Sequence, residues 1–439
     1  MKKQAHAAEM NDPRDLVALD DDYAAGAGDA SIERARPIPR ISIQAFCETP
    51  AVAEVAQIAA DDRRLSKAHV SVHMGGAPAA VAHYQESPTP NLIVVESSQP
   101  RGQMLADLDR LAECCDAGTK VIIIGHYNDV VLYRELLKRG VSEYLIAPVG
   151  VPALMESISN LYNDPNTDPV GHVLAYIGAK GGVGSSTVCH NVSWTLSEVL
   201  KSNVIIADLD LAFGTTGLDF NQDPVQGIAD ALAAPERLDE VLLDRLLTKC
   251  SEHLSIFAAP VVLDRDYDIS PDACDMVIDV VRQNVPYVAV DLPHTWTAWT
   301  KRVLMQADEV IITAAPDLAN LRNAKNIVDL LKGSRKHDRP PHLVINMANV
   351  PKRPEITVKE FEQALEIKAC AVIDYDSESF GQAANNGQMI EELNGKAKPV
   401  ASFRDIAMKI THRTDTKIEK KAASGGFMPI LEKLKLKRS

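Results

Sequence analysis

Short apolar runs alternate with longer amphipathic stretches along most of the chain. The first series begins at residue 41 with I-S-I-Q-A-F and continues through H-V-S-V-H, N-L-I-V-V, K-V-I-I-I-G and Y-L-I-A-P, with helical patterns over 50–64, 77–86, 102–115, 129–139 and 151–162. This alternation predicts about five βα units, because right-handed crossovers place helices on both faces of a parallel sheet. Residues 40–162 are therefore expected to form a doubly wound α/β domain.

A second parallel-sheet α/β domain is predicted over residues 171–412. Its expected strands are nearly continuous apolar runs, which are typical of buried parallel strands. They lie at 173–177, 204–208, 287–291, 309–313 and 342–346. The segment N-D-P-N-T-D-P at 163–169 is dense in turn formers, so residues 163–170 are predicted to be a linker.

The two ends of the chain lack a sustained pattern. Residues 1–39 are rich in Ala, Asp, Arg and Pro, which predicts a disordered arm. Residues 413–439 form a basic tail in which apolar residues from Phe427 to Leu434 recur at helical spacing, interrupted by Pro429. The tail leaves three interpretations open: peripheral contact with an anionic inner membrane, a solvated segment, or a helix that docks on a partner.

Composition indicates a cytoplasmic protein of two or three domains. The chain has 439 residues, of which 46% are hydrophobic and 24% are charged. Its formal charge of -14 argues against general coating of nucleic acid, and no specific nucleic acid is expected as a partner. The seven cysteines contain no C-x-x-C pair. No stretch approaches the roughly 18 apolar residues that a membrane span needs.

The run K-G-G-V-G-S-S-T at 180–187 is the strongest chemical signal. It joins an apolar strand to a helical stretch, so its amides can converge on a phosphate at a helix N-terminus. The residues expected to contact nucleotide here are Gly181, Gly182, Val183, Gly184, Ser185, Ser186 and Thr187. Ser185 stands where an ordinary phosphate-binding loop has lysine, and Ser186 holds the hydroxyl position that binds magnesium. The alternative is a flexible glycine turn without a ligand.

This run resembles the deviant Walker A motif of MinD and ParA ATPases, K-G-G-x-G-K-[ST]-[ST], at seven of eight positions. The resemblance implies an ATP- and Mg-binding homodimer in which Lys180 reaches the partner's phosphates. Because Ser185 replaces the second lysine, ATP binding is expected and hydrolysis is expected to be slow or lost.

Polar residues at three other strand ends extend the resemblance. Asp208 and Asp210 follow one strand, and Asp291 ends another, beside the phosphate crevice expected of such a sheet. The resemblance implies that Asp210 orients the attacking water and that Asp291 contacts magnesium through water. It also implies that Asn346 reads adenine. The alternatives are an acidic helix cap for the aspartate pair and a turn residue for Asn346.

The first domain resembles a response-regulator receiver, most clearly at E-L-L-K-R-G-V-S-E-Y-L-I-A-P over 135–148. Its active positions are replaced, so phosphotransfer is not expected and the domain is assigned to docking or dimerisation. The replacements are Phe46, Cys47, Glu96, Gly125 and Ala147. Glu96 is predicted to be an ordinary solvated side chain, and the alternative is a permanent mimic of a charged acceptor.

Both halves together resemble the CpaE/TadZ proteins of Flp-type pilus assembly, with 125–134 and 380–390 particularly similar. The resemblance implies a localisation factor that recruits pilus assembly and secretion ATPase proteins at the cell pole. The alternative is a ParA/MinD-type partition or positioning ATPase that acts on DNA or division proteins. A phosphorelay regulator and a dinucleotide oxidoreductase are disfavoured, because the acceptor site and the G-x-G-x-x-G pattern are missing.

Overall fold

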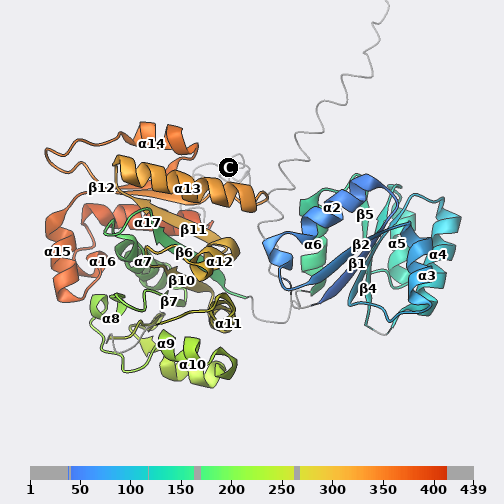
Figure 1. The fold of residues 1–439 in the computed structure, drawn as a ribbon, viewed down its shortest axis with the longest axis horizontal. Helices are drawn as coiled ribbons and strands as arrows, with labels where there is room; N and C mark the ends of the chain where they lie inside the picture. Colours follow the sequence, from blue (N-terminus) through green and yellow to red (C-terminus); the bar gives the residue numbers. More distant parts are fainter. Residues whose placement is uncertain (1–37, 39–40, 117, 163–169, 262–266, 413–439) are drawn as a thin grey trace, which may run out of the picture. The chain divides into compact units, whose positions relative to one another are not determined.

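The computed structural model describes residues 38, 41–116, 118–162, 170–261 and 267–412, which form two compact units (Figure 1). The first unit comprises the described residues up to Tyr162 with the short segment 335–339, and the second comprises the rest. The predicted arm, linker and basic tail lie outside the described residues, apart from Ile38 and Val170. Among the described helices, none combines the length and apolar character required to cross a bilayer.

The first unit is a five-stranded parallel sheet between two layers of helices. Its elements are β1 (Ser42–Cys47), α2 (Pro50–Ala60), η1 (Arg63–Leu65), β2 (His69–Met74), α3 (Gly76–Tyr84), β3 (Leu92–Ser97), α4 (Arg101–Cys114), β4 (Lys120–Gly125), α5 (Val130–Lys138), β5 (Glu143–Ile146) and α6 (Val151–Tyr162). The strand order is β2-β1-β3-β4-β5. One core cluster joins the sheet to α2 and α6, and another joins it to α3, α4 and α5. The predicted receiver-like architecture is confirmed.

Glu96, at the end of β3, is fully buried, so the prediction of a solvated side chain is wrong. Its carboxylate accepts hydrogen bonds from the backbone amides of Glu48 at 2.7 Å and Thr49 at 2.8 Å, and from the Thr49 hydroxyl at 2.8 Å. His126 Nε2 lies 3.2 Å from the same carboxylate. These donors explain how a charged group tolerates burial, and they fasten the start of α2 to the end of β3.

The other replaced receiver positions are filled with apolar or unreactive groups. Phe46 and Cys47 are both buried in the core, and burial, aided by the nearby charge of Glu96, raises the pKa of Cys47 to about 11. The Tyr144 ring fills the space beside Gly125, and its hydroxyl donates to the Tyr127 carbonyl at 2.8 Å. The edge that carries the chemistry of a receiver is therefore closed by packing.

The second unit is an eight-stranded sheet with helices on both faces. Its first half contains β6 (His172–Gly178), α7 (Ser185–Trp194), η2 (Thr195–Val199), β7 (Val204–Asp208), α8 (Thr216–Asp219), α9 (Ile228–Ala233), η3 (Pro235–Arg237), α10 (Glu240–Leu246), β8 (Thr248–Lys249), β9 (Leu254–Phe257) and α11 (Pro271–Arg282). Its second half contains β10 (Tyr287–Asp291), α12 (Ala298–Gln306), β11 (Glu309–Ala314), α13 (Leu318–Ser334), β12 (His342–Ala348), α14 (Val358–Leu365), β13 (Ala369–Asp374), α15 (Ser377–Asn386), α16 (Ile390–Leu393) and α17 (Lys398–Ile410).

The strand order β13-β12-β11-β6-β10-β7-β9-β8 places β6 near the middle of this sheet. All neighbouring strands are parallel except β8 and β9. One core cluster packs α11, α12 and α13 on one face, and another packs α7 and α17 on the other. The segment that follows β6 therefore lies at the centre of the carboxyl edge, between the ends of β10 and β11.

We expect the Glu96→Gln variant to lower the free energy of unfolding of the first unit by about 2 kcal/mol, because a neutral amide replaces a buried acceptor of charge-assisted hydrogen bonds. Urea-dependent hydrogen exchange in the segment 42–60, followed by mass spectrometry, measures this change. Glu113→Gln, on the exposed side of α4, is the matched control. Equal stabilities for both variants and the parent chain would contradict the structural role of Glu96.

Candidate functional site

The loop between β6 and α7 forms a turn over the centre of the sheet edge. Gly181 and Gly182 are exposed, whereas Val183 is buried, which fixes the loop to the core. Gly182 and Gly184 have φ angles of 76° and 84°, a conformation that favours glycine. No side chain caps α7, so its first backbone amides face the loop without an internal partner. This arrangement can bind an anion such as a phosphate once a second group supplies charge.

Asn346 fastens the loop from the neighbouring strand β12. Its side-chain amide donates to the Val183 carbonyl at 2.8 Å, and a Cβ added to Gly184 would lie 2.5 Å from the same nitrogen. Because β12 continues to Ala348, the alternative that Asn346 is a turn residue is wrong. Its side chain is almost fully buried beside the helix N-terminus. The adenine-reading role stays a prediction.

The predicted hydroxyl and lysine positions lie at different depths. Ser185 Oγ is buried without a hydrogen-bond partner in the described structure, while the Ser186 hydroxyl bonds to the Asp291 carboxylate. Lys180 is exposed at the outer end of the loop. Burial raises the pKa of Asp317, but hydrogen bonds from Asn320 and the nearby charge of Lys180 outweigh that effect and lower it overall. Lys180 therefore lies close enough to Asp317 to affect its charge.

Asp208 and Asp291 lie side by side, because β7 and β10 are neighbours and their register pairs these two residues. Both side chains are buried. Asp208 accepts from the Thr216 hydroxyl at 2.7 Å and from the Asp210 amide at 3.1 Å. Asp210 is half-buried and accepts from the Phe213 amide at 3.1 Å, so it caps the turn after β7 in this structure.

His190 is a residue of this site that the sequence analysis missed. It is fully buried on α7, with Nδ1 2.8 Å from Asp219, Nε2 3.0 Å from the Thr216 hydroxyl and Nε2 3.7 Å from the Asp291 carboxylate. Burial lowers the pKa of His190, but the hydrogen bond to Asp219 and the surrounding carboxylates raise it overall. The only signal in the sequence is its position four residues after Ser186, on the same helix face.

Asp291 titrates far above an ordinary aspartate. Burial raises its pKa from 3.8 to about 7, and the charge of Asp208 adds to this, while His190 and the bond from Ser186 act in the opposite direction. Its Oδ1 atom is buried without a hydrogen-bond partner among the described residues. An open carboxylate oxygen beside a serine hydroxyl suits magnesium, which commonly uses only one or two protein ligands. The described residues contain no cluster of three or more His, Cys, Asp or Glu arranged around a metal position.

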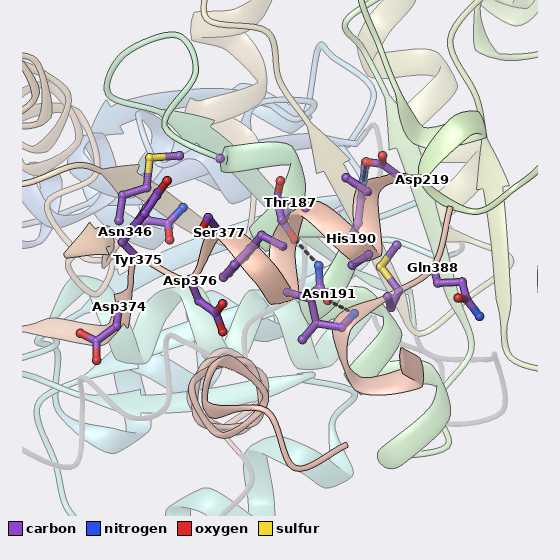
Figure 2. Close-up of a pocket in the computed structure, with 18 residues that line it drawn as sticks. Thr187, His190, Asn191, Asp219, Asn346, Asp374, Tyr375, Asp376, Ser377 and Gln388 are labelled. Atoms are coloured by element: carbon purple, nitrogen blue, oxygen red, sulfur yellow. Dashed lines mark hydrogen bonds and ion pairs between the residues drawn. The ribbon is translucent and has the colours of Figure 1, made fainter. Parts of the chain in front are cut away.

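A cavity of about 320 Å³ opens beside the first turn of α7 (Figure 2). Figure 2 shows Asn346 and Tyr375 at one end and Asp219 and Gln388 at the other. The segment 380–390, which the sequence analysis singled out, supplies much of the wall. The lining residues that the sequence analysis did not predict include His190, Asn191, Asp219, Asp374, Tyr375, Asp376 and Ser377. The cavity adjoins the phosphate-binding loop through Gly184 and Thr187, so it can hold a nucleoside attached to a phosphate chain.

A second cavity, of about 460 Å³, lies on the other side of the loop. It is bordered by Ala179, the segment 294–296 and α13. His294 Nδ1 lies 3.0 Å from the Gly178 carbonyl, and Asn323 donates to the Ala179 carbonyl at 2.8 Å. The loop is thus held from both flanks by side chains of neighbouring segments.

Comparison with known proteins agrees with this geometry. The family model described as "AAA domain" matches residues 171–343. MinD, the septum site-determining protein of Bacillus subtilis (strain 168), is 24% identical over 255 residues, which cover 55% of this chain and 89% of that protein. The solved ParA family ATPase from Chlorobium tepidum TLS is 26% identical, with a TM-score of 0.50, and the match covers 54% of this chain and 98% of that one. The fold and the loop define a P-loop ATPase of the MinD/ParA class.

A further solved structure identifies the family more closely. The pilus assembly protein CpaE from Caulobacter crescentus CB15 is 48% identical, with a TM-score of 0.29, and the match covers 29% of this chain and 98% of that one. The low TM-score accompanies a match to less than a third of this chain, and the assignment rests on the sequence identity. The chain belongs to the CpaE family.

We expect the Asp291→Asn variant, without nucleotide or magnesium, to be more stable than the parent chain at pH 8 by a few kcal/mol. With a pKa of about 7 in the fold, Asp291 keeps a proton that the unfolded chain releases near pH 4, so the parent loses stability as the pH rises through this window. The difference should fall to about 1–2 kcal/mol near pH 5 and vanish below about pH 4. Unfolding followed by tryptophan fluorescence measures it, since Trp194, Trp296 and Trp299 all lie in the second unit.

The matched control is Asp244→Asn, on the exposed side of α10. A gain in stability that is the same at pH 5 and pH 8 would contradict the raised pKa.

Proposed function

We propose that this chain is an ATP-binding, dimerising localisation factor for Flp-type pilus assembly and its secretion machinery. Membership of the CpaE family and the MinD/ParA-class fold support a pilus-assembly or positioning ATPase. The observation that carries the proposal is the convergence of the first turn of α7, the Ser186 hydroxyl and the open Asp291 oxygen at one sheet edge.

ATP would bind with its phosphates at residues 181–187 and its base in the cavity beside Asn346. The free amides of α7 supply hydrogen-bond donors, and Asn346 holds the loop in the shape that exposes them. Ser186 and Asp291 would hold magnesium, and Asp208 would support Asp291 from the adjoining strand. Magnesium, when bound, would neutralise part of the phosphate charge beside the two aspartates.

Hydrolysis would be slow or absent, because the loop lacks a lysine at position 185. A lysine there would place a positive charge within a few ångströms of the phosphates, which is worth several kcal/mol at intermediate dielectric. Ser185 offers only a hydroxyl. In the described conformation, Asp210 caps the turn to Phe213. Asp210 would have to leave that bond to orient a water molecule, which adds to the barrier.

Association of two copies is favoured by apolar side chains around the loop. Phe213, Trp296 and Leu318 are 76%, 56% and 73% exposed, and they follow the carboxyl ends of β7, β10 and β11. These ends share the edge that carries the phosphate-binding loop, so a second copy facing this edge would cover them together with bound nucleotide. Lys180, exposed at the outer end of the loop, is placed to reach that copy's phosphates.

The proposed partners are pilus assembly and secretion ATPase proteins at the cell pole. The protein would act in the cytoplasm, peripheral to the inner membrane, with ATP shifting the population towards the dimer that recruits them. The acidic net charge of -14 favours protein partners over DNA.

We expect Lys180→Ala to weaken ATP-dependent dimerisation by about tenfold or more, because it removes the one cation that the exposed loop presents to a facing copy. Sedimentation velocity with and without Mg·ATP measures the effect. Lys359→Ala, an exposed lysine on α14, is the matched control. Identical mass distributions for Lys180→Ala and the parent chain in ATP would refute this role.

Replacing the serine of the loop tests the assignment of slow turnover. We expect Ser185→Lys to raise the rate of phosphate release by about tenfold or more, since it restores a charge that stabilises the transition state. Ser185→Met has a similar length without the charge and should leave the rate unchanged. A rate for Ser185→Lys no higher than that for Ser185→Met, with ATP still bound, would show that the missing lysine does not limit turnover.

A further inference from the structure

Exposed apolar side chains of the first unit gather around α5. In the described part of this unit, the large exposed apolar residues are Ile58, Met74, Tyr127, Val130, Val131, Tyr133, Leu137 and Ile146. All but Ile58 and Met74 lie on α5, just before it, or at the end of β5. Val130 is 62% exposed. Such a concentration is unusual for a surface without a partner.

Five of these residues lie on the flank of α5 near β5 or in the segments beside it. Leu132 and Leu136 are the residues of α5 that pack into the core. The helical repeat then places Val130, Tyr133 and Leu137 on the flank that faces β5. The Tyr133 ring lies 6.5 Å from that of Tyr144 in β5. Strand alternation puts Ile146 on the same face of the sheet as Tyr144. We call Tyr127, Val130, Tyr133, Leu137 and Ile146 the α5 patch.

The rim of the α5 patch is basic. Arg134 and Lys138 are exposed on α5, and neither makes an ion pair within the described structure. The nearest acidic residue of the helix, Glu135, is already bound to Arg101 at 2.5 Å and to Arg139 at 3.2 Å. An occupant of this surface should therefore combine apolar side chains with unpaired negative charges.

We propose that residues 16–23 of this chain, L-V-A-L-D-D-D-Y, dock on the α5 patch. This segment of the arm places Leu16, Val17 and Leu19 directly before Asp20, Asp21 and Asp22. Its apolar residues match the centre of the patch, and its three carboxylates match Arg134 and Lys138. The docked segment shields the surface and must leave before another protein can use it. This inference does not depend on ATP binding or on the proposed pilus role.

The length of the connecting chain allows this contact. Residues 24–37 separate the segment from Ile38, where description of the first unit begins. A random coil of about 14 residues spans roughly 20 Å on average, and a fully extended chain of that length spans about 45 Å. A domain of this size is about 30–40 Å across, which is less than the extended length of the connection. Tethering also gives an effective concentration near the millimolar range, so a weak contact suffices.

A second copy fits the same surface less well. A symmetric dimer places the same patch on both sides, so the unpaired Arg134 and Lys138 of one copy would meet a surface that also carries unpaired positive charges. The α5 patch contains no exposed carboxylate free to compensate them, since Glu135 is occupied by Arg101 and Arg139. Charge complementarity therefore favours the arm.

Hydrogen exchange of the segment 127–138 in the full chain without nucleotide tests the proposal. Exchange should become about five- to tenfold faster in the Asp20→Asn/Asp21→Asn/Asp22→Asn variant, and also in Arg134→Glu/Lys138→Glu, because each removes the charge attraction that holds a tethered contact. Combining Arg134→Glu/Lys138→Glu with Asp20→Lys/Asp21→Lys/Asp22→Lys should restore the slow exchange, which a general loss of helix stability would not allow.

The matched control is Asp12→Asn/Asp29→Asn/Glu33→Gln, which removes the same charge from other parts of the arm and should leave exchange unchanged. Equal exchange in the parent chain and the Asp20→Asn/Asp21→Asn/Asp22→Asn variant would overturn the proposal. Protection that rises with protein concentration to the same extent in both would also overturn it, in favour of a second copy. Neither outcome bears on nucleotide binding.

Discussion

The candidate site of the second unit depends on one interaction, the contact between the first turn of α7 and the buried carboxylates of β7 and β10. The strand register brings Asp208 and Asp291 together; on α7, the Ser186 hydroxyl bonds to Asp291 and His190 Nε2 lies 3.7 Å from the same carboxylate. Burial, with a smaller contribution from the charge of Asp208, raises the pKa of Asp291 to about 7. The fold keeps a destabilising charge pair at the place where a phosphate-bound cation would offset it. Such storage of unfavourable energy is common at functional sites.

The two units use the same kind of sheet edge in opposite ways. In the second unit, the edge keeps an open carboxylate oxygen, exposed glycines and a cavity. In the first unit, Glu96 takes up the donors around the former acceptor position, and Tyr144 fills the space beside Gly125. Because the Glu96 carboxylate already accepts these hydrogen bonds, it leaves no position for a transferred phosphoryl group. The first unit is therefore suited to contact with other segments, and its exposed apolar residues gather beside α5.

The sequence was most informative where hydrophobic periodicity was strong. The ten strands expected from apolar runs are present, because the periodicity of apolar residues is a local signal that the sequence carries directly. Three strands of the second unit were not predicted: β13 has several exposed and half-buried positions, and the short β8 and β9 follow several small helices. Their pairing depends on neighbours that are distant in the sequence.

The proximity of Ser186 and Asp291 could be anticipated, because a loop motif and a strand end fixed their positions, while their roles stay predictions. His190 was missed because its role depends on three carboxylates from separate segments, which only the folded sheet brings together. Glu96 was misjudged for the same reason, since the amides that satisfy it come from the turn after β1. The clamp by Asn346 on Val183 likewise joins residues far apart in the chain. Contacts of this kind carry no local periodic signal.

The most direct test of the central claim is calorimetric titration of the full chain with ATP, with and without magnesium. The site described above requires a cation to offset Asp291 and its neighbour, so saturable heat should appear with Mg·ATP and be strongly reduced when magnesium is chelated. Gly184→Ala, whose Cβ would strike Asn346, should remove that heat while the chain stays folded. An absence of heat at millimolar Mg·ATP in the parent chain would contradict the account.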